Sequence, residues 1–188
     1  MPFVALLDAN ALYPQWLRDA LLRTAETGVF QVRWSERILA EASRNIKADR
    51  PDIDPAVVDR TFEDMRRSFE EAMVEGYESL EPAMKNAAED RHVLAAAIVG
   101  RADLIVTVNL DDFPAAALEP YGLDVQHPDE FLCNQWELDE ESMVAAIRLW
   151  LEDLSNPPLS LDQLLQKLEL HTPRFCKMVR QSDLGQRD

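Results

Sequence analysis

Short apolar runs alternate with longer segments of helical spacing along the first 130 residues. Residues 3–7 and 104–108 are almost continuously apolar, and a weaker run covers 123–126. Runs of this length, bounded by polar residues, predict buried strands. Strands that alternate with helices predict a three-layer α/β domain with a central parallel sheet flanked by helices.

The longer segments carry the signals of helix ends as well as helical spacing. Pro14 suits a first turn, Ser35 is a good N-cap, and Asp54-Pro55 opens a third segment that Gly76 closes. The stretch 93–99 is apolar on every side, which predicts a buried helix. Together these signals predict helices at about 14–26, 36–49, 54–75 and 93–99.

The remainder of the chain has only helical patterns. We predict helices at about 139–153, 160–169 and 172–180, with a break at Asn156-Pro157-Pro158. We therefore divide the chain into an α/β domain at 1–132 and a helical C-terminal extension at 133–188. The apolar series Val144, Ile147, Leu151 and Leu154 must be buried, so these helices are expected to dock on the first domain or on a partner.

Composition limits the classes of protein to consider. No apolar stretch is long enough to span a membrane, and the first residues lack the features of a signal peptide. Two cysteines do not make a disulfide framework, which favours a reducing, cytoplasmic location. The net charge of −16 argues against a protein that coats nucleic acid, but it is compatible with a carboxylate-rich nuclease site.

Carboxylates follow both main strands. Asp8 ends the first strand, with Asn10 two residues later, and Asn109, Asp111 and Asp112 follow the strand at 104–108. Ligands of open α/β sheets bind outside the carboxyl ends of strands. Oxygen donors in this position predict a site for Mg²⁺ or Mn²⁺, which could activate water for phosphodiester hydrolysis.

Each of these acids also has a structural interpretation. Asp8 could be a hydrogen-bonded turn residue, and Asp90 an N-terminal acid favoured by the helix dipole. Glu41 lies between Arg37 and Arg44, so it could belong to an exposed ladder of ion pairs. Alternatively, Glu41 faces Asp8 while the two arginines bind phosphate.

The chain resembles the PIN domain family, and within it the VapC-type ribonuclease toxins. The resemblance rests on four motifs, which are Leu6-Leu7-Asp8-Ala9-Asn10, Glu41, Asp90-Arg91-His92-Val93-Leu94-Ala95-Ala96-Ala97 and Asn109-Leu110-Asp111-Asp112-Phe113-Pro114. It implies that Asp8, Glu41, Asp90 and Asp112 are the catalytic, metal-binding acids. Asn10, Asn109 and Asp111 have supporting roles, and Asp111 is the alternative to Asp112 for the fourth place.

The same resemblance implies a Mg²⁺- or Mn²⁺-dependent endoribonuclease with an RNA substrate and a cognate antitoxin, and a homodimer is compatible with it. Three alternatives stay open. A phosphatase of the haloacid-dehalogenase type would need a second Asp where this chain has Asn10. A silent PIN module would bind a partner without binding metal. A PIN nuclease that processes RNA would not act as a toxin.

Overall fold

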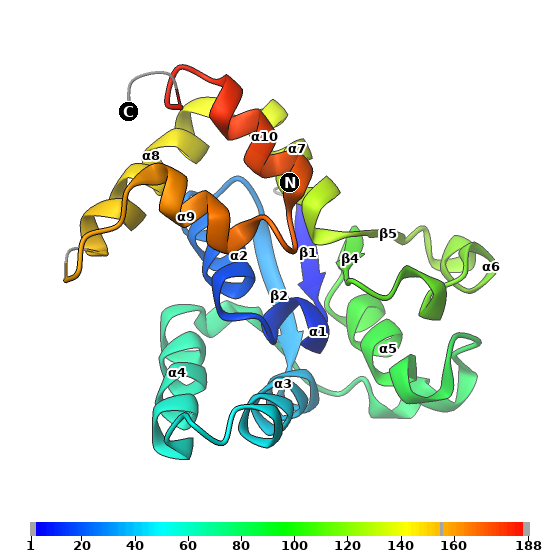
Figure 1. Ribbon diagram of the computed structural model, residues 1–188. Coiled ribbons are helices and arrows are strands. Elements are labelled where there is room, and N and C mark those ends of the chain that lie inside the picture. Colours follow the sequence, from blue (N-terminus) through cyan, green and yellow to red (C-terminus); the bar gives the residue numbers. More distant parts are fainter. Residues whose placement is uncertain (1–2, 155, 186–188) are drawn as a thin grey trace.

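The computed structural model describes residues 3–154 and 156–185, and within them it contains a five-stranded parallel sheet (Figure 1). The strand order is β3-β2-β1-β4-β5. The strands are β1 (Val4–Leu7), β2 (Gln31–Ser35), β3 (Met73–Val74), β4 (Leu104–Val106) and β5 (Asp124–Gln126). The α/β class with a parallel sheet, predicted from the sequence, is thereby confirmed.

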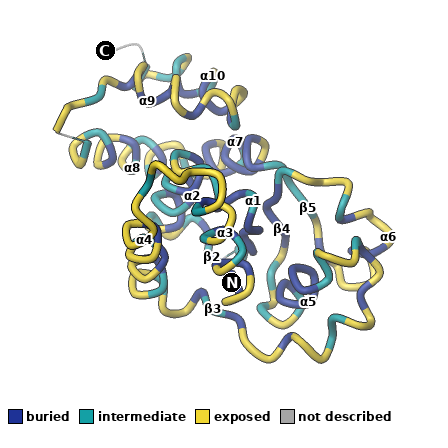
Figure 2. The backbone as a smooth tube through the Cα atoms, turned by 60° about the horizontal axis from the view of Figure 1, so that its bottom comes forward, coloured by how far each residue is buried: buried dark blue, intermediate teal, exposed yellow. Residues whose placement is uncertain are grey.

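Helices connect the strands and continue after the last one. The α-helices are α1 (Ala9–Leu12), α2 (Gln15–Glu26), α3 (Glu36–Asp49), α4 (Pro55–Ser68), α5 (Arg91–Val99), α6 (Ala115–Leu118), α7 (Pro128–Leu138), α8 (Glu140–Asp153), α9 (Leu161–Leu168) and α10 (Pro173–Gln181). Short 3₁₀ turns are η1 (Glu70–Ala72), η2 (Glu78–Ala83), η3 (Ala88–Asp90), η4 (Leu110–Asp112) and η5 (Glu119–Tyr121). Helix α5 is buried along most of its length, as its sequence predicts (Figure 2).

The order of the strands reverses between β1 and β4. From β1 the chain moves outward to β2 and β3, then returns to place β4 on the other side of β1. Because parallel connections are right-handed, the outward connections through α2 and α3 cover one face and the return through α5 covers the other. The carboxyl ends of β1 and β4 are therefore the switch point, where α/β proteins bind ligands.

Several elements differ from the sequence prediction. Strand β2 was not predicted, because Gln31 and Arg33 interrupt its apolar residues. The helix predicted to reach residue 75 ends at Ser68, because the two residues of β3 pair with the end of β2 instead. Strand β4 ends at Val106 rather than at residue 108. Helix α7 was also missed, although Pro128 stands in its first turn.

Helices α8 and α9 pack on α2, and α10 packs on α7 and α9, so the C-terminal helices dock on the rest of the chain as predicted. Trp16 of α2 lies 6.2 Å from Trp150 of α8, measured between ring centroids, and Lys167 of α9 lies 5.0 Å from the centroid of Trp16. Arg23 forms an ion pair of 2.8 Å with Asp153. The buried face of α8 consists of Met143, Ile147 and Trp150, whereas the predicted Val144, Leu151 and Leu154 are partly buried beside it.

Helix α7 connects the sheet to these last helices. Its Phe131 packs edge-to-face on Phe30, which precedes β2, at 4.9 Å between ring centroids. Its buried Asp129 accepts backbone hydrogen bonds from Arg174 and Phe175 at the start of α10. The expected boundary between residues 132 and 133 lies within α7, and the division into two domains stays a prediction. None of the described helices is long and apolar enough to cross a membrane.

Candidate active site

Asp8 stands directly after β1 and begins α1. Its Oδ1 accepts the backbone N–H of Ala9 at 2.7 Å, which makes it the N-cap of that helix. Its Oδ2 accepts hydrogen bonds from Asn10 Nδ2 at 2.7 Å and from Thr107 Oγ1 at 2.9 Å. The side chain is hydrogen-bonded, as the structural interpretation of the sequence requires, but these neutral donors leave its negative charge without a cation.

Asn10 and Thr107 join the ends of β1 and β4. Asn10 Oδ1 accepts the backbone N–H of Val108 at 2.9 Å, and Asn10 Nδ2 lies 2.9 Å from Thr107 Oγ1. Thr107 is fully buried and also receives the backbone N–H of Asn109. These bonds fix the orientation of the Asp8 carboxylate. Thr107 was not among the predicted site residues, although a polar residue late in an apolar strand was a usable signal.

Asp90 occupies the N-cap position of α5 without acting as a cap. Its side chain accepts no hydrogen bond from the first turn of the helix. Burial, which is the largest cause, and the nearby carboxylates of Asp8, Asp112 and Glu41 together raise its pKa from 3.8 to about 7. A capping acid near a helix N-terminus would have its charged form stabilised. The observed environment does the opposite.

Glu41 extends from α3 toward α5 and does not belong to a ladder of arginines. Its Oε2 lies 3.5 Å from Nε2 of His92, a buried residue of α5. Burial and the charge of Arg37 lower the pKa of His92 to about 4, so its imidazole is neutral near pH 7. Nδ1 of His92 is buried without a partner, which places the single proton best on Nε2, facing Glu41.

The two arginines that flank Glu41 have different environments. Arg37 forms an ion pair of 3.0 Å with Glu81 of η2, which partly neutralises its charge. Arg44 is exposed and, within the described residues, forms no ion pair or side-chain hydrogen bond. Arg44 is therefore the more available of the two for an anionic ligand.

The acids after β4 lie in the turn η4. Asp112 is half-buried, and its carboxylate raises the pKa of both Asp8 and Asp90. Asp111 and Asn109 are exposed. The backbone N–H of Ala87 donates to the Asp112 carbonyl at 3.4 Å, which links this turn to the segment before α5. Asp112 is thus the member of this turn that is electrostatically coupled to the other acids.

Four carboxylates therefore lie close enough at the switch point of the sheet to repel one another electrostatically. Asp8 is 4 % exposed, and its pKa is raised to about 6, mainly by burial and also by the charges of Glu41 and Asp112. Hydrogen bonds from Thr107 and Ala9 act in the opposite direction without cancelling the shift. Clustered carboxylates whose mutual repulsion and burial disfavour ionisation are typical of catalytic and metal-binding sites.

The donor set fits a hard divalent cation by its chemistry. All four acids present oxygen atoms, and a cation would relieve the repulsion that raises the pKa values of Asp8 and Asp90. Within residues 3–154 and 156–185, however, no three His, Cys, Asp or Glu side chains converge closely enough to hold a metal ion. Coordination would require at least some of these side chains to rotate toward one another.

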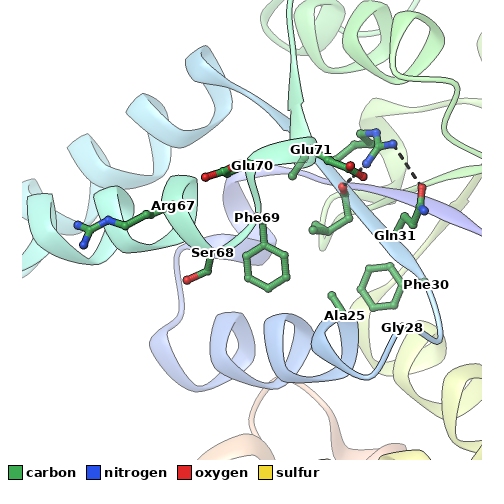
Figure 3. Close-up of a pocket in the computed structure, with 12 residues that line it drawn as sticks. Ala25, Gly28, Phe30, Gln31, Arg67, Ser68, Phe69, Glu70 and Glu71 are labelled. Atoms are coloured by element: carbon green, nitrogen blue, oxygen red, sulfur yellow. Dashed lines mark hydrogen bonds between the residues drawn. The ribbon is translucent and has the colours of Figure 1, made fainter.

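A cavity of about 420 Å³ lies elsewhere, at the beginning of β2 (Figure 3). Phe30 and Phe69 form part of its wall, and Gln31 and Arg33 contribute polar groups. The beginning of β2 marks the amino ends of the parallel strands, whereas the acids lie at their carboxyl ends. This cavity is therefore separate from the acidic site.

Comparison with known proteins agrees with this geometry. A family model described as "PIN domain" matches residues 4–111, and one described as "VapC50 C-terminal domain" matches residues 128–181. The chain is similar to a Mycobacterium tuberculosis (strain ATCC 25618 / H37Rv) protein named "Putative ribonuclease VapC50", with 44% identity over 105 residues. The match covers 56% of this chain and 62% of that protein. No solved structure matches. Because the first family model covers more than half of its length, the chain belongs to the PIN domain family.

Proposed function

We propose that this protein is a divalent-metal-dependent endoribonuclease and the toxin of a toxin–antitoxin pair. The observation that carries the nuclease proposal is the buried Asp8 at the switch point, coupled to Glu41, Asp90 and Asp112. Membership of the PIN family and the name of the similar protein support the choice of ribonuclease. The toxin role rests on that similarity alone.

In this proposal the four acids hold Mg²⁺ or Mn²⁺, with Asp8 and Asp90 as the central ligands. The bound cation would supply an activated water and stabilise the leaving oxygen of the phosphodiester. Asn10 and Thr107 hold the Asp8 carboxylate in place through the hydrogen bonds described above. His92 positions Glu41, and Arg44, with Arg37 beside it, binds phosphate groups of the RNA.

The experiment is metal-dependent cleavage of structured RNAs by the purified chain. Activity should disappear in EDTA and return with Mn²⁺, because a cation is required to activate water. Asp8→Asn and Asp90→Asn should each lower cleavage by roughly a hundred- to a thousandfold, the scale of removing one electrostatic group from an active site. Asp64→Asn, an exposed variant on α4, should cleave normally. Calorimetry should show loss of Mn²⁺ binding in the Asp8→Asn, Asp90→Asn double variant.

Several results would contradict these assignments. Cleavage that continues unchanged in excess chelator would exclude the metal-dependent mechanism. Metal binding without cleavage of any RNA would favour a silent binding module. Comparing Asp112→Asn with Asp111→Asn decides the fourth position, since we expect the larger loss for Asp112.

Growth experiments address the toxin role and the partners. The lone chain should arrest growth, and co-expression of a neighbouring antitoxin should relieve the arrest. A harmless but active ribonuclease would instead favour an RNA-processing nuclease. Cytoplasmic location and a homodimer stay predictions, to be checked by fractionation and by light scattering.

A further inference from the structure

A second cavity, separate from the acidic site, lies where four parts of the first domain meet. Its volume is about 200 Å³. Its wall comes from the α1–α2 connection, from α2, from the end of α3 with the loop after it, and from α4. The lining residues are Tyr13, Pro14, Gln15, Arg18, Ile46, Arg50, Ile53, Val57, Val58, Thr61 and Phe62.

Arg18 of α2 is the notable polar group in this wall. The residue is 6 % exposed, and its Nη1 donates to the Leu12 carbonyl at 2.9 Å. The guanidinium lies 5.7 Å from the centroid of the Phe62 ring. Nε is buried without a hydrogen-bond partner, and among the described residues no carboxylate lies within ion-pair distance of this guanidinium. The carboxylate of Asp19, the next residue of α2, favours the charged guanidinium from beyond ion-pair distance, but burial is the larger effect and lowers the pKa of Arg18. A buried arginine with no carboxylate in direct contact is costly, so its position calls for an explanation.

The charge of the lining is opposite to that of the whole chain. The sequence has 35 acidic and 19 basic residues, yet the cavity wall contains two arginines and no carboxylate. Arg50 is already neutralised by Asp52, through hydrogen bonds of 2.8 and 2.7 Å. Arg18 is therefore the positive group that a bound anion could neutralise, and the rest of the wall is mostly apolar.

We propose that this cavity binds a small monocarboxylate with an apolar body. The carboxylate would pair with Arg18, because a guanidinium forms strong charge-assisted hydrogen bonds with a carboxylate. The apolar body would pack against Ile46, Val58 and Phe62. The volume is below the roughly 300–1,000 Å³ of pockets for drug-sized ligands, so the ligand is about as large as one side chain. The proposal does not depend on nuclease activity.

Calorimetric titration of the full chain with phenylacetate tests this proposal. Phenylacetamide has the same shape without the charge, so it should bind at least about tenfold more weakly than phenylacetate. Arg18→Gln should weaken phenylacetate binding by a similar factor. Arg60→Gln provides a matched control, because Arg60 is an arginine of α4 that does not line the cavity.

A second variant tests the proposal if Arg18→Gln does not fold. Thr61→Phe keeps Arg18 but places a ring in the cavity, so it should abolish binding while circular dichroism stays native. Equal affinities for the acid and the amide would overturn the proposal. So would unchanged binding in a folded Arg18→Gln or Thr61→Phe variant, or no binding of phenylacetate at millimolar concentrations.

Discussion

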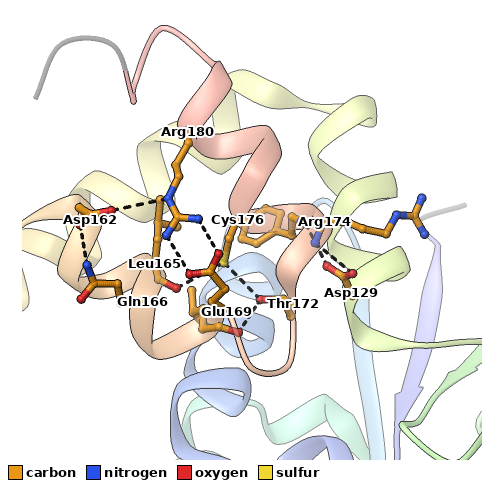
Figure 4. A network of polar contacts seen from close by, with 11 residues as sticks. Asp129, Asp162, Leu165, Gln166, Glu169, Thr172, Arg174, Cys176 and Arg180 are labelled. Atoms are coloured by element: carbon orange, nitrogen blue, oxygen red, sulfur yellow. Dashed lines mark hydrogen bonds and ion pairs between the residues drawn. The ribbon is translucent and has the colours of Figure 1, made fainter.

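The acidic site and the C-terminal helices place carboxylates in opposite environments. At the switch point of the sheet, Asp8 and Asp90 face other carboxylates, and their pKa values rise to about 6 and about 7. In the C-terminal helices, Asp129, Asp162 and Glu169 face hydrogen-bond donors instead (Figure 4). Buried Asp129 accepts two backbone N–H groups, and Glu169 forms a two-bond pair with Arg180.

Within one chain, the carboxylates of the C-terminal helices stabilise the fold, whereas those at the switch point are arranged for a function. Carboxylates that meet donors lower the free energy of the folded state and hold helices together. Carboxylates that meet each other raise it, and such an arrangement persists only where a ligand or a reaction uses it. The acidic site is therefore expected to reduce stability, whereas the C-terminal network should increase it.

Removing the last three helices should have the largest effect on stability. A chain ending at Asp139 loses the buried side chains of Met143, Ile147 and Trp150 and exposes the face of α2 that they cover. Burial of such side chains contributes about 1.5–3 kcal/mol each, so the loss should exceed roughly 5 kcal/mol. We expect aggregation or a much lower unfolding temperature, measured by gel filtration and thermal unfolding.

The acidic site should be intact in whatever fraction of the shortened chain stays folded. Mn²⁺ binding, followed by calorimetry, is therefore expected to persist in the soluble fraction. A monomeric shortened chain with the unfolding temperature of the full chain would show that the docking contributes no stability.

Asp129→Ala should give the next largest effect, because it leaves two N–H groups of α10 without an acceptor. The free energy of unfolding should fall by about 2–3 kcal/mol, as buried donors lose their partner. Asp54→Ala is the matched control, since Asp54 caps α4 at an exposed position, and it should cost about 1 kcal/mol. Urea unfolding measures both. Equal effects would show that burial at Asp129 adds nothing to the cap.

Asp90→Asn should give the smallest effect and the opposite sign. The folded-state pKa of Asp90 is raised to about 7, so its contribution to stability is complete below pH about 4 and is lost as pH rises through about 7. Asparagine carries no charge at any pH. The variant should therefore be more stable than the parent near pH 8 and equally stable near pH 4.

Urea unfolding in EDTA at both pH values checks this prediction. Added Mn²⁺ should reverse the order near pH 8, because binding stabilises only the parent. If the free energy of unfolding of parent and variant depends on pH in the same way, the pKa of Asp90 is not raised in the folded protein.

The sequence contained most of the elements and the candidate acids, but not the relations between them. Asp8 and Asp112 were visible as acids after apolar strands, and α5 was visible as a run apolar on all sides. Strand β2 was missed because Gln31 and Arg33 interrupt its apolar residues, although such alternation is typical of a half-buried strand. The role of Thr107 was missed because its hydroxyl bonds to Asp8 and Asn10, which are far away in the sequence. Without the family resemblance, the residues alone left Glu41 open between an ion-pair ladder and the acidic site, since its partner, His92, lies on another helix.

The sequence by itself determined the α/β class, the helical C-terminal region and the set of carboxylates. These follow from local periodicity and from residue types, which act over a few neighbouring positions. Only the tertiary structure decided which acids repel each other, that Asp129 caps α10, and that Arg18 lines a cavity with no carboxylate in direct contact. Burial and electrostatic coupling depend on distances between segments far apart in the chain, and the fold alone sets those distances.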